Sequence, residues 1–500
     1  MERDYHLCLS PDALEADATL LDTVREAGVS TIWLTGFLYG YWHYPVEQAV
    51  RWREQVQRRG MKAHVVNVPL GHPGDALGAM HGNVPLTPPR HWRMGVRSDG
   101  SQYAGTSLHP PACEENTEAI RLLARHGFRQ AFLDDDFRLA QSPGTVGGCF
   151  CPEHRQRFLQ KYGYAESRWE ELLHAVQQRR LSPVLRHWCE FHCDELTSCF
   201  RTLQRAERGT QLGIMVMYMG SEKAGIRLGD YSRVPFRVGE GMFDDGSFGS
   251  LKGRMNELFS VLFHRRFVRP EMAFSETTAY PADRLSARHL AAKLVISTLA
   301  DVRHTMFMSG LSPFPRSYWE TLAPAMRKQA QLHRQVAGQQ PAGPLKHFWG
   351  EAGRYVGDDD PFSLFMAMGV PFEVSDTPPR DGWVFLGDQD ATELPPSTWK
   401  DSRAVRVVRP HVRCEGKLCR RVEEALPALF ALKQEIVATL KDVPWVEEDK
   451  PVVCVWYPKI FTVALWNLSE GEERLTVRFG ERRYTVSVPA LDLALVSLSG

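Results

Sequence analysis

The segment QAFLDDD, residues 130–136, is the stretch of this 500-residue chain that decides its fold. It is a short apolar run that ends in three acids, which is typical of a buried strand. Similar runs alternate with helix-period segments from the start of the chain to about residue 338. The expected helices are 13–27, 46–59, 114–126 and 286–299, and a glycine follows each of the first three as a left-handed stop. Such alternation predicts βα units around a parallel sheet. The expected strands are 5–10, 31–37, 62–69, 130–136, 211–219, 236–243, 271–278 and 304–310, and eight of them predict a (β/α)8 TIM barrel.

The pattern changes after the barrel, which we expect to span residues 1–338. The sequence VAGQQPAGPLK, residues 336–346, has the glycine and proline content of a linker. Short strands and helices then alternate over 339–445, which predicts a small α/β domain of Rossmann or amidotransferase type. From 446 to 500 the chain shows strands separated by turn residues and no helix, which predicts a small antiparallel β-domain, a β-sandwich.

Composition and charge exclude several classes of protein. The chain is 43% hydrophobic, so it is not disordered, and it holds 60 basic and 60 acidic residues. A balanced charge leaves no excess field for nucleic acid or an anionic membrane, and a neutral substrate fits better. The sequence shows no secretory signal and no apolar run of about 18 residues, which predicts a soluble, cytoplasmic protein. Cysteines that cluster in a reducing compartment more often hold metal than form disulfides.

Several expected strands end in acids, and these are the candidate catalytic groups. Carboxylates at the carboxyl ends of parallel barrel strands should converge on one cleft. Glu276 is the best single candidate, because the small hydroxyl residues Ser275, Thr277 and Thr278 beside it can keep a carboxylate charged. Such an environment suits a nucleophile.

The triplet Asp134, Asp135 and Asp136 is the second group of candidates. Mutual repulsion raises the pKa of at least one of these acids, as a proton donor near neutral pH requires. The alternatives are an ion-pair network with Arg138 or a metal site with oxygen ligands. Paired acids on opposite sides of a pocket most economically serve glycoside hydrolysis.

A cysteine-rich loop follows the same strand in the sequence GGCFCPEH, residues 147–154. Cys149, Cys151 and His154 offer three ligands that Zn²⁺ accepts in tetrahedral geometry. A closed structural site needs a fourth ligand. The natural candidate is Cys113, which lies just before the helix that leads into strand 130–136, at the same face of the barrel. The alternative is a set of buried thiols with a surface histidine.

These motifs resemble family 42 of the glycoside hydrolases, the clan-A β-galactosidases, over roughly residues 109–163 and at Glu276. That family ends its fourth strand in Asp-Asn-Glu-Tyr, where this chain has Asp134-Asp135-Asp136-Phe137. The resemblance implies Asp136 as general acid/base, Asp135 as a contact of the sugar 2-hydroxyl and Glu276 as nucleophile. It also implies a structural zinc at the four ligand positions named above, and a homotrimer built by the α/β domain.

The altered motif leaves the sugar and the stereochemistry open. Asp136 is one methylene shorter than the family's glutamate, and carboxyl groups about 6.5–9.5 Å apart would favour inversion over retention. Other side chains expected to reach sugar hydroxyls or stack on the sugar are Asp134, Trp42, Asn67, Arg97, His109, Tyr218, Glu240 and His304.

The sequence therefore predicts a glycoside hydrolase that cleaves a β-linked glycoside with retention, a β-galactosidase or a related exo-glycosidase. It would need no organic cofactor, and its zinc would fasten the loop and take no part in the chemistry. Three alternatives stay open: an inverting glycosidase that uses the aspartate cluster, a non-catalytic carbohydrate-binding barrel, and a hydrolase whose catalytic metal is held by the aspartates.

Overall fold

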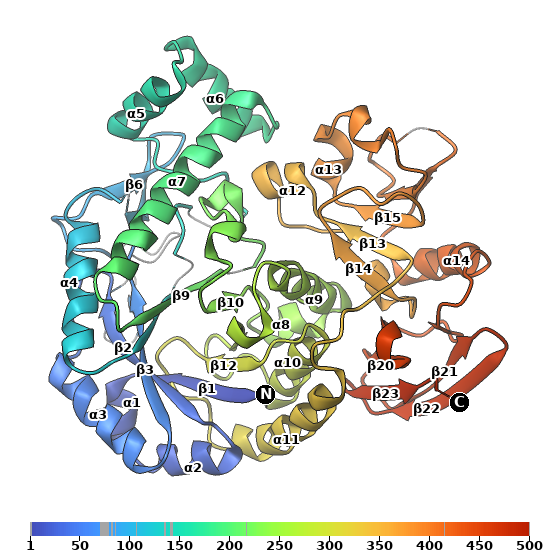
Figure 1. Cartoon of the computed structure of the whole chain (residues 1–500), viewed down its shortest axis with the longest axis horizontal. Coiled ribbons are helices and arrows are strands. Elements are labelled where there is room, and N and C mark those ends of the chain that lie inside the picture. The colour runs from blue at the N-terminus through green and yellow to red at the C-terminus, as the bar shows by residue number, and fades with distance from the viewer. Residues whose placement is uncertain are drawn as a thin grey trace.

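The computed structural model describes residues 3–70, 80–81, 84–85, 87–106, 108–134, 137–140, 144–216, 218–414 and 416–499. Its amino-terminal part is a closed parallel barrel, so the predicted (β/α)8 fold is confirmed (Figure 1). The barrel strands are β1 (Asp4–Leu9), β2 (Thr31–Leu38), β3 (Lys62–Val68), β8 (Gln130–Leu133), β9 (Gln211–Met215), β10 (Phe236–Val238), β11 (Ala273–Thr278) and β12 (His304–Met308). They neighbour one another in chain order, and β12 closes on β1.

Three strands are shorter than the sequence predicts at their carboxyl ends. β8 ends at Leu133, β9 at Met215 and β10 at Val238, although apolar runs suggested strands to 136, 219 and 243. The described residues that follow directly, Asp134, Val216 and Gly239, belong to no strand. Strand pairing therefore stops where the candidate functional residues begin.

Helices surround the barrel, and most lie where the sequence predicts them. They are α1 (Pro11–Ala16), α2 (Leu20–Ala27), α3 (Val46–Arg58), α4 (Ala112–Arg125), α7 (Pro183–Arg205), α8 (Asp245–Gly249), α9 (Leu251–Arg265), α10 (Ala287–Leu299) and α11 (Tyr318–Val336). α2 ends at Gly28, whose positive φ of 112° is the left-handed stop expected there. The single helix expected over 13–27 is two helices, because the Asp17 carboxylate accepts hydrogen bonds from Thr19 and opens a turn.

Two long inserts extend the mouth of the barrel. The first contains the short strands β4 (Met80–His81), β5 (Val84–Pro85), β6 (Met94–Val96) and β7 (Gln102–Thr106). The second contains α5 (Pro152–Tyr162), α6 (Ser167–Gln178) and the start of α7, which stand apart from the barrel in Figure 1. Phe158, Trp169 and Trp188 are buried in a small apolar core of their own. This core gives the second insert a rigid base above the barrel.

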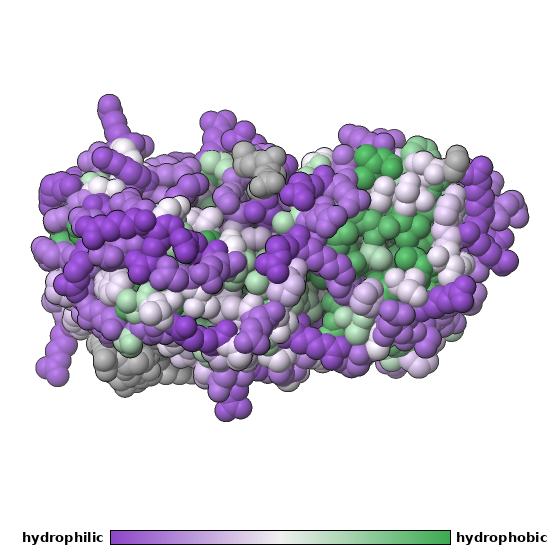
Figure 2. Space-filling model, turned by 90° about the horizontal axis from the view of Figure 1, so that it is seen from below, coloured by the Kyte–Doolittle hydropathy of each residue, from purple (hydrophilic) through white to green (hydrophobic). Residues whose placement is uncertain are grey.

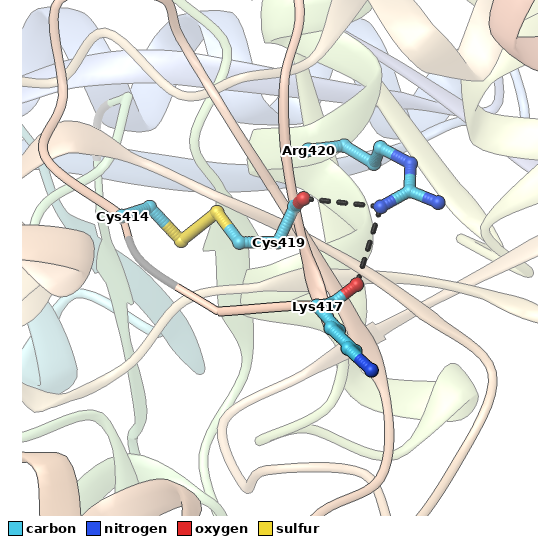
Figure 3. The surroundings of a disulfide bond; sticks show 4 residues. All are labelled: Cys414, Lys417, Cys419 and Arg420. Carbon is cyan, nitrogen blue, oxygen red and sulfur yellow. Dashed lines mark hydrogen bonds between the residues drawn. A yellow bond between two sulfur atoms is a disulfide. The ribbon is translucent and has the colours of Figure 1, made fainter.

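The α/β domain is a parallel sheet in the order β14-β13-β15-β16-β17. Its elements are β13 (Leu345–Phe348), α12 (Glu351–Val356), β14 (Phe372–Ser375), β15 (Trp383–Leu386), α13 (Asp388–Glu393), β16 (Val405–Val408), β17 (Cys419–Arg421) and α14 (Leu426–Val437). Cys414 and Cys419, to which the sequence analysis assigned no role, form a disulfide (Figure 3). The Arg420 guanidinium donates to the carbonyls of Lys417 and Cys419 beside it.

The carboxyl-terminal domain is two three-stranded antiparallel sheets, as the strand-only pattern predicts. Their strands are β18 (Trp445–Val446), β21 (Glu473–Phe479) and β22 (Arg482–Val488), and β19 (Val452–Tyr457), β20 (Thr462–Asn467) and β23 (Leu493–Ser497). The described residues also form six 3-10 turns: η1 (Glu222–Ala224), η2 (Leu228–Tyr231), η3 (Pro270–Met272), η4 (Leu364–Ala367), η5 (Pro396–Trp399) and η6 (Pro458–Ile460).

The surface shows where the molecule is apolar. Figure 2 shows an apolar region at the end of the molecule that the second and third domains occupy, whereas polar side chains cover most of the barrel in that view. Leu418 in the second domain and Phe461 in the third are among the most exposed large apolar side chains. None of the helices in the described part of the chain is long and apolar enough to span a membrane.

The interior of the barrel is packed, with histidines on its floor. Trp33 Nε1 donates to His6 Nδ1 (3.1 Å), and His6 Nε2 lies 3.3 Å from Nδ1 of His304. His304 Nε2 lies 3.2 Å from the Glu271 carbonyl oxygen, so one chain of hydrogen bonds is completed with both rings neutral. Burial lowers the pKa of His6 and His304, and it lowers the pKa of the nearby His64 to about 4.

His64→Phe tests this neutral floor. The pKa of His64 is lower in the folded than in the unfolded chain, so the unfolded chain binds more protons between pH 6.5 and about 4. As the pH decreases through this window, we expect the free energy of unfolding of the wild type to fall relative to that of the variant by about 1.4 kcal/mol per pH unit. Urea unfolding at pH 7 and pH 4.5 measures it. His174→Phe, an exposed control on α6, should show no such trend, and parallel pH curves for wild type and His64→Phe would refute the assignment.

Candidate active site

Three charged side chains meet inside the barrel near its mouth. Asp134 follows β8, Arg237 lies on β10 and Glu276 lies on β11. The Arg237 guanidinium, fully buried, pairs with the Asp134 carboxylate, and its Nη2 lies 3.8 Å from Glu276 Oε1. The same Nη2 donates to Met308 Sδ at 3.3 Å. One buried cation therefore joins the ends of three barrel strands.

Strand alternation explains why these residues point inward. Phe132 on β8 and Phe274 on β11 pack with Trp33 in the apolar layer inside the barrel. Since side chains two residues apart on a strand share a face, Asp134 and Glu276 face the same interior one layer nearer the mouth. Arg237 follows the same rule, because Phe236 and Val238 on either side of it belong to the outer core.

The surroundings of Glu276 differ from those expected. Ser275 and Thr277 point away from it and hydrogen-bond each other at 2.9 Å. Only Thr278 remains of the three hydroxyl residues, and its Oγ1 donates to Glu276 Oε1 at 3.5 Å. Burial therefore raises the pKa of Glu276 well above its ordinary value, although Arg237 opposes this shift. The prediction that hydroxyl groups keep this carboxylate charged is wrong, because strand alternation turns two of them outward.

Several buried polar atoms of the barrel strands have no hydrogen-bond partner. Glu276 Oε2, Arg237 Nε, Thr35 Oγ1 and Asn67 Nδ2 are buried and form no hydrogen bond. Unsatisfied buried polar groups are uncommon in folded proteins, because each loses the free energy of its hydrogen bonds to water. These atoms lie at or near the carboxyl ends of barrel strands, where a bound molecule can satisfy them.

The other residues predicted to contact sugar lie in different places. Asp135 and Asp136, the predicted sugar contact and acid/base, lie outside the described residues. Asn67 lies on β3, where its Oδ1 accepts from the Phe37 amide at 3.0 Å and its carbonyl accepts from Asp134. Trp42 packs on Phe37 with ring centroids 5.3 Å apart. Asn67 and Trp42 are therefore near the mouth.

Two further predicted sugar contacts, Tyr218 and Arg97, are half-buried, and both hydrogen-bond other groups of the chain. Tyr218 follows β9, and its hydroxyl donates to the Asp359 carbonyl of the α/β domain at 3.1 Å. Arg97 lies in the turn between β6 and β7 and hydrogen-bonds Ser101 and the Gln102 carbonyl. Tyr218 connects the mouth to another domain, whereas the bonds of Arg97 brace its own hairpin.

The structure corrects two of the predicted sugar contacts. Glu240 is fully buried and points outward from the barrel toward α9 and α10, where its Oε2 lies 3.2 Å from Lys293 Nζ. Lys293 also pairs with Glu257 at 2.9 Å, and burial raises the pKa of Glu240 to about 8. His304 begins β12, so it lies on the floor of the barrel and not at its mouth. Both predictions rested on membership of an expected strand, which does not by itself place a side chain inside the barrel near its mouth.

The cysteine loop does bring metal-binding groups together. Cys149, Cys151, His154 and His109 place their ligand atoms within 4.8 Å of one another, and all four residues are buried. Cys151 Sγ lies 3.3 Å from His109 Nε2 and 3.3 Å from His154 Nδ1. The Glu153 carboxylate lies 3.3 Å from the other nitrogen of His109, so it holds that ring with Nε2 facing the sulfur.

Two predictions about this loop are therefore corrected. Cys113, predicted as the fourth ligand, lies outside the group, and the Cys199 thiol on α7 donates to its sulfur at 3.7 Å. His109, predicted to reach the sugar, takes the fourth position. Cys113 is the second residue of α4, whereas His109 precedes that helix and the cis peptide between Pro110 and Pro111. A donor set of two thiols and two imidazoles, with a carboxylate behind one ring, fits tetrahedral zinc.

Arg237 and Lys293 are functional residues that the sequence analysis did not identify. A signal for Arg237 was present, since it is the only charged residue within the short run Phe236–Val238. No comparable signal exists for Lys293, which lies in the regular helix α10 and is placed against two glutamates only by the packing of helices.

Comparison with known proteins gives similar structures but no similar sequence. The sequence matches no protein-family model and no curated protein. The fold is similar to the β-galactosidase of the haloarchaeon Halorubrum lacusprofundi, with a TM-score of 0.61, 11% identity and 99% of each chain covered. A β-galactosidase from Bacillus circulans sp. alkalophilus has a TM-score of 0.60 and 9% identity, with 99% of this chain and 98% of that chain covered. The α-L-fucosidase isoenzyme 2 of Paenibacillus thiaminolyticus has a TM-score of 0.59 and 10% identity, with both chains fully covered. At identities this low, the structural similarity shows a shared fold alone.

Arg237→Met tests whether one cation balances both carboxylates. The substitution leaves Asp134 and Glu276 buried without a cation, so we expect the protein to lose about 3–5 kcal/mol of stability at pH 7. The loss should shrink as the pH falls toward 4.5, because the two carboxyl groups can then take up protons in the folded state. Urea unfolding at both pH values measures this. Arg237→Lys, which keeps the charge, should lose less, and equal stability of Arg237→Met and wild type would contradict the assignment.

Proposed function

We propose that this protein is a glycoside hydrolase and that the mouth of the barrel is its active site. The observation that carries the proposal is the inward carboxylate of Glu276, with one unpartnered oxygen, joined through Arg237 to Asp134 across the barrel. Asp134 begins the acidic triplet, which Asp135 and Asp136 continue in the sequence. The similarity of the whole fold to two β-galactosidases and an α-L-fucosidase supports the same reaction class.

Asp136 and Glu276 would share the chemistry of a retaining hydrolase. The Glu276 carboxylate attacks the anomeric carbon while the Asp136 carboxyl group gives its proton to the glycosidic oxygen, so the bond to the leaving alcohol breaks. Asp136 then takes a proton from water, and the hydroxide displaces Glu276 from the sugar. Two inversions restore the starting configuration. No organic cofactor enters this scheme.

Substrate binding would stabilise the ionised form of Glu276, which a nucleophile needs. Its pKa is raised in the free protein, because the carboxyl group is buried and Oε2 has no partner. A sugar hydroxyl that donates to Oε2 stabilises the ionised form, and Arg237 already favours it. A bound polyhydroxylated ligand would therefore favour the ionised, nucleophilic form of Glu276.

Glu276→Gln tests the proposed nucleophile. We expect kcat/KM on aryl glycosides to fall by about 10³-fold or more, because the amide cannot form the glycosyl ester. The assay uses nitrophenyl β-D-galactoside, β-D-glucoside and α-L-fucoside. Glu271→Gln is the matched control, since Glu271 is exposed near the opposite end of the same strand and should keep full activity. Full activity of both Glu276→Gln and Asp136→Asn would refute the proposal, and saturable sugar binding without turnover by the wild type would favour a binding protein.

We further propose that His109, Cys149, Cys151 and His154 hold a structural zinc ion. Four protein ligands leave no position for a reacting water, so the metal would fasten the loop after β8 to the segment before α4. This agrees with the buried donor set and with the carboxylate of Glu153 behind His109.

Paired substitutions test the ligand set. We expect His109→Ala to lower the zinc content well below one ion per chain and Cys113→Ser to leave it unchanged, because Cys113 lies outside the group. Inductively coupled plasma mass spectrometry of the purified proteins measures this. Zinc lost from Cys113→Ser and kept by His109→Ala would contradict the assignment, as would wild-type protein without stoichiometric metal.

A further inference from the structure

The second domain reaches the barrel through the segment between α12 and η4, residues 357–361. This segment lies against Lys223 in η1, which follows barrel strand β9. The Lys223 ammonium is fully buried, donates to the Gly357 carbonyl at 2.8 Å and pairs with the Asp359 carboxylate. A cation of the barrel is thus neutralised by a carboxylate of the other domain.

The burial of this pair restricts where the segment can lie. The Asp359 side chain is only 8% exposed, and removing one partner of a buried ion pair costs several kcal/mol because the other charge is stranded. Further contacts hold the same junction. Arg179 donates to the carbonyls of Val356 and Gly144, and the Lys223 carbonyl accepts from the Gly147 amide at 2.6 Å. The segment therefore has one low-energy position on the barrel.

Tyr218 connects this junction to the mouth of the barrel. Its hydroxyl donates to the carbonyl of Asp359, the residue that Lys223 holds. On its other side a Cβ built on Gly241 would lie 2.7 Å from Tyr218 Cβ, so the loop after β10 packs closely against it. The side chain is half-buried, with its hydroxyl used by the second domain and part of its surface exposed.

We propose that Asp359, held by Lys223, is a positioning residue that fixes Tyr218 as a wall of the sugar pocket. The second domain would then complete the active site of its own chain. This inference rests on the proposed function, because it assigns the aromatic face of Tyr218 to the apolar face of a sugar. Aromatic rings pack on such faces, and their contribution depends on a fixed orientation.

Steady-state kinetics on aryl glycosides test the inference with Lys223→Met, Tyr218→Phe and the double variant. We expect each single variant to raise KM about 10-fold while kcat stays within about threefold, since binding and not chemistry is disturbed. The double variant should be no worse than Lys223→Met alone, because both substitutions break one connection. Lys252→Met is the matched control, since Lys252 binds Asp360 and the Pro361 carbonyl of the same segment and makes no contact with Tyr218. It should leave KM unchanged.

Three outcomes would overturn the inference. In the first, the KM effects of Lys223→Met and Tyr218→Phe multiply in the double variant. In the second, Lys252→Met raises KM as much as Lys223→Met does, so the segment acts only by docking the domains. In the third, hydrogen exchange at the amides of Tyr218 and Met219 is unchanged in Lys223→Met, where we expect it to quicken. The exchange measurement needs no substrate, so it still tests the junction if the wild type hydrolyses no glycoside and the proposed function fails.

Discussion

The mouth of the barrel depends on one buried guanidinium. Arg237 neutralises Asp134 and faces Glu276, and without it two carboxylates would lie in the barrel interior with no cation. Just behind them Lys293 serves Glu240 and Glu257 in the same way. Two cations thus face four buried carboxyl groups, and burial raises the pKa of Glu240 and of Glu276. Such groups can change their charge when a ligand changes their surroundings, and this is the property that acid/base chemistry needs.

Structural features around the mouth constrain its loops from several sides. The cysteine and histidine group draws the loop after β8 onto the segment before α4. From the second domain, Asp359 is held by Lys223, whose carbonyl accepts from Gly147, two residues before Cys149. The loop of Cys149 and Cys151 and the domain junction therefore meet at one short stretch of backbone. Rigid surroundings of this kind favour precise placement of a substrate.

The fold could be predicted from the sequence to a large extent, because each barrel strand is a distinct apolar run and each domain has its own pattern of elements. The ends of β8, β9 and β10 could not, since the sequence does not mark where pairing with the neighbouring strands stops. Glu276 was found because it ends its strand, and Cys149, Cys151 and His154 because their spacing is local. The positions of His109, Arg237 and Lys293 in the site depend on packing between elements that are far apart in the sequence. Local residue spacing cannot predict such packing. The sequence favours Cys113 as the fourth ligand because it lies at the same face of the barrel, but the start of α4 places its thiol against Cys199 of α7.

The central claim is that Glu276 is a nucleophile that forms a covalent bond with a sugar. Incubation with an activated 2-deoxy-2-fluoro glycoside of the best substrate, followed by intact-mass measurement and peptide mapping, tests it most directly. The claim predicts one fluoroglycosyl group per chain, attached to the peptide that contains Glu276, and loss of activity in step with labelling. A label on another carboxylate, or continued turnover of substrate by unlabelled enzyme after saturating treatment, would contradict it.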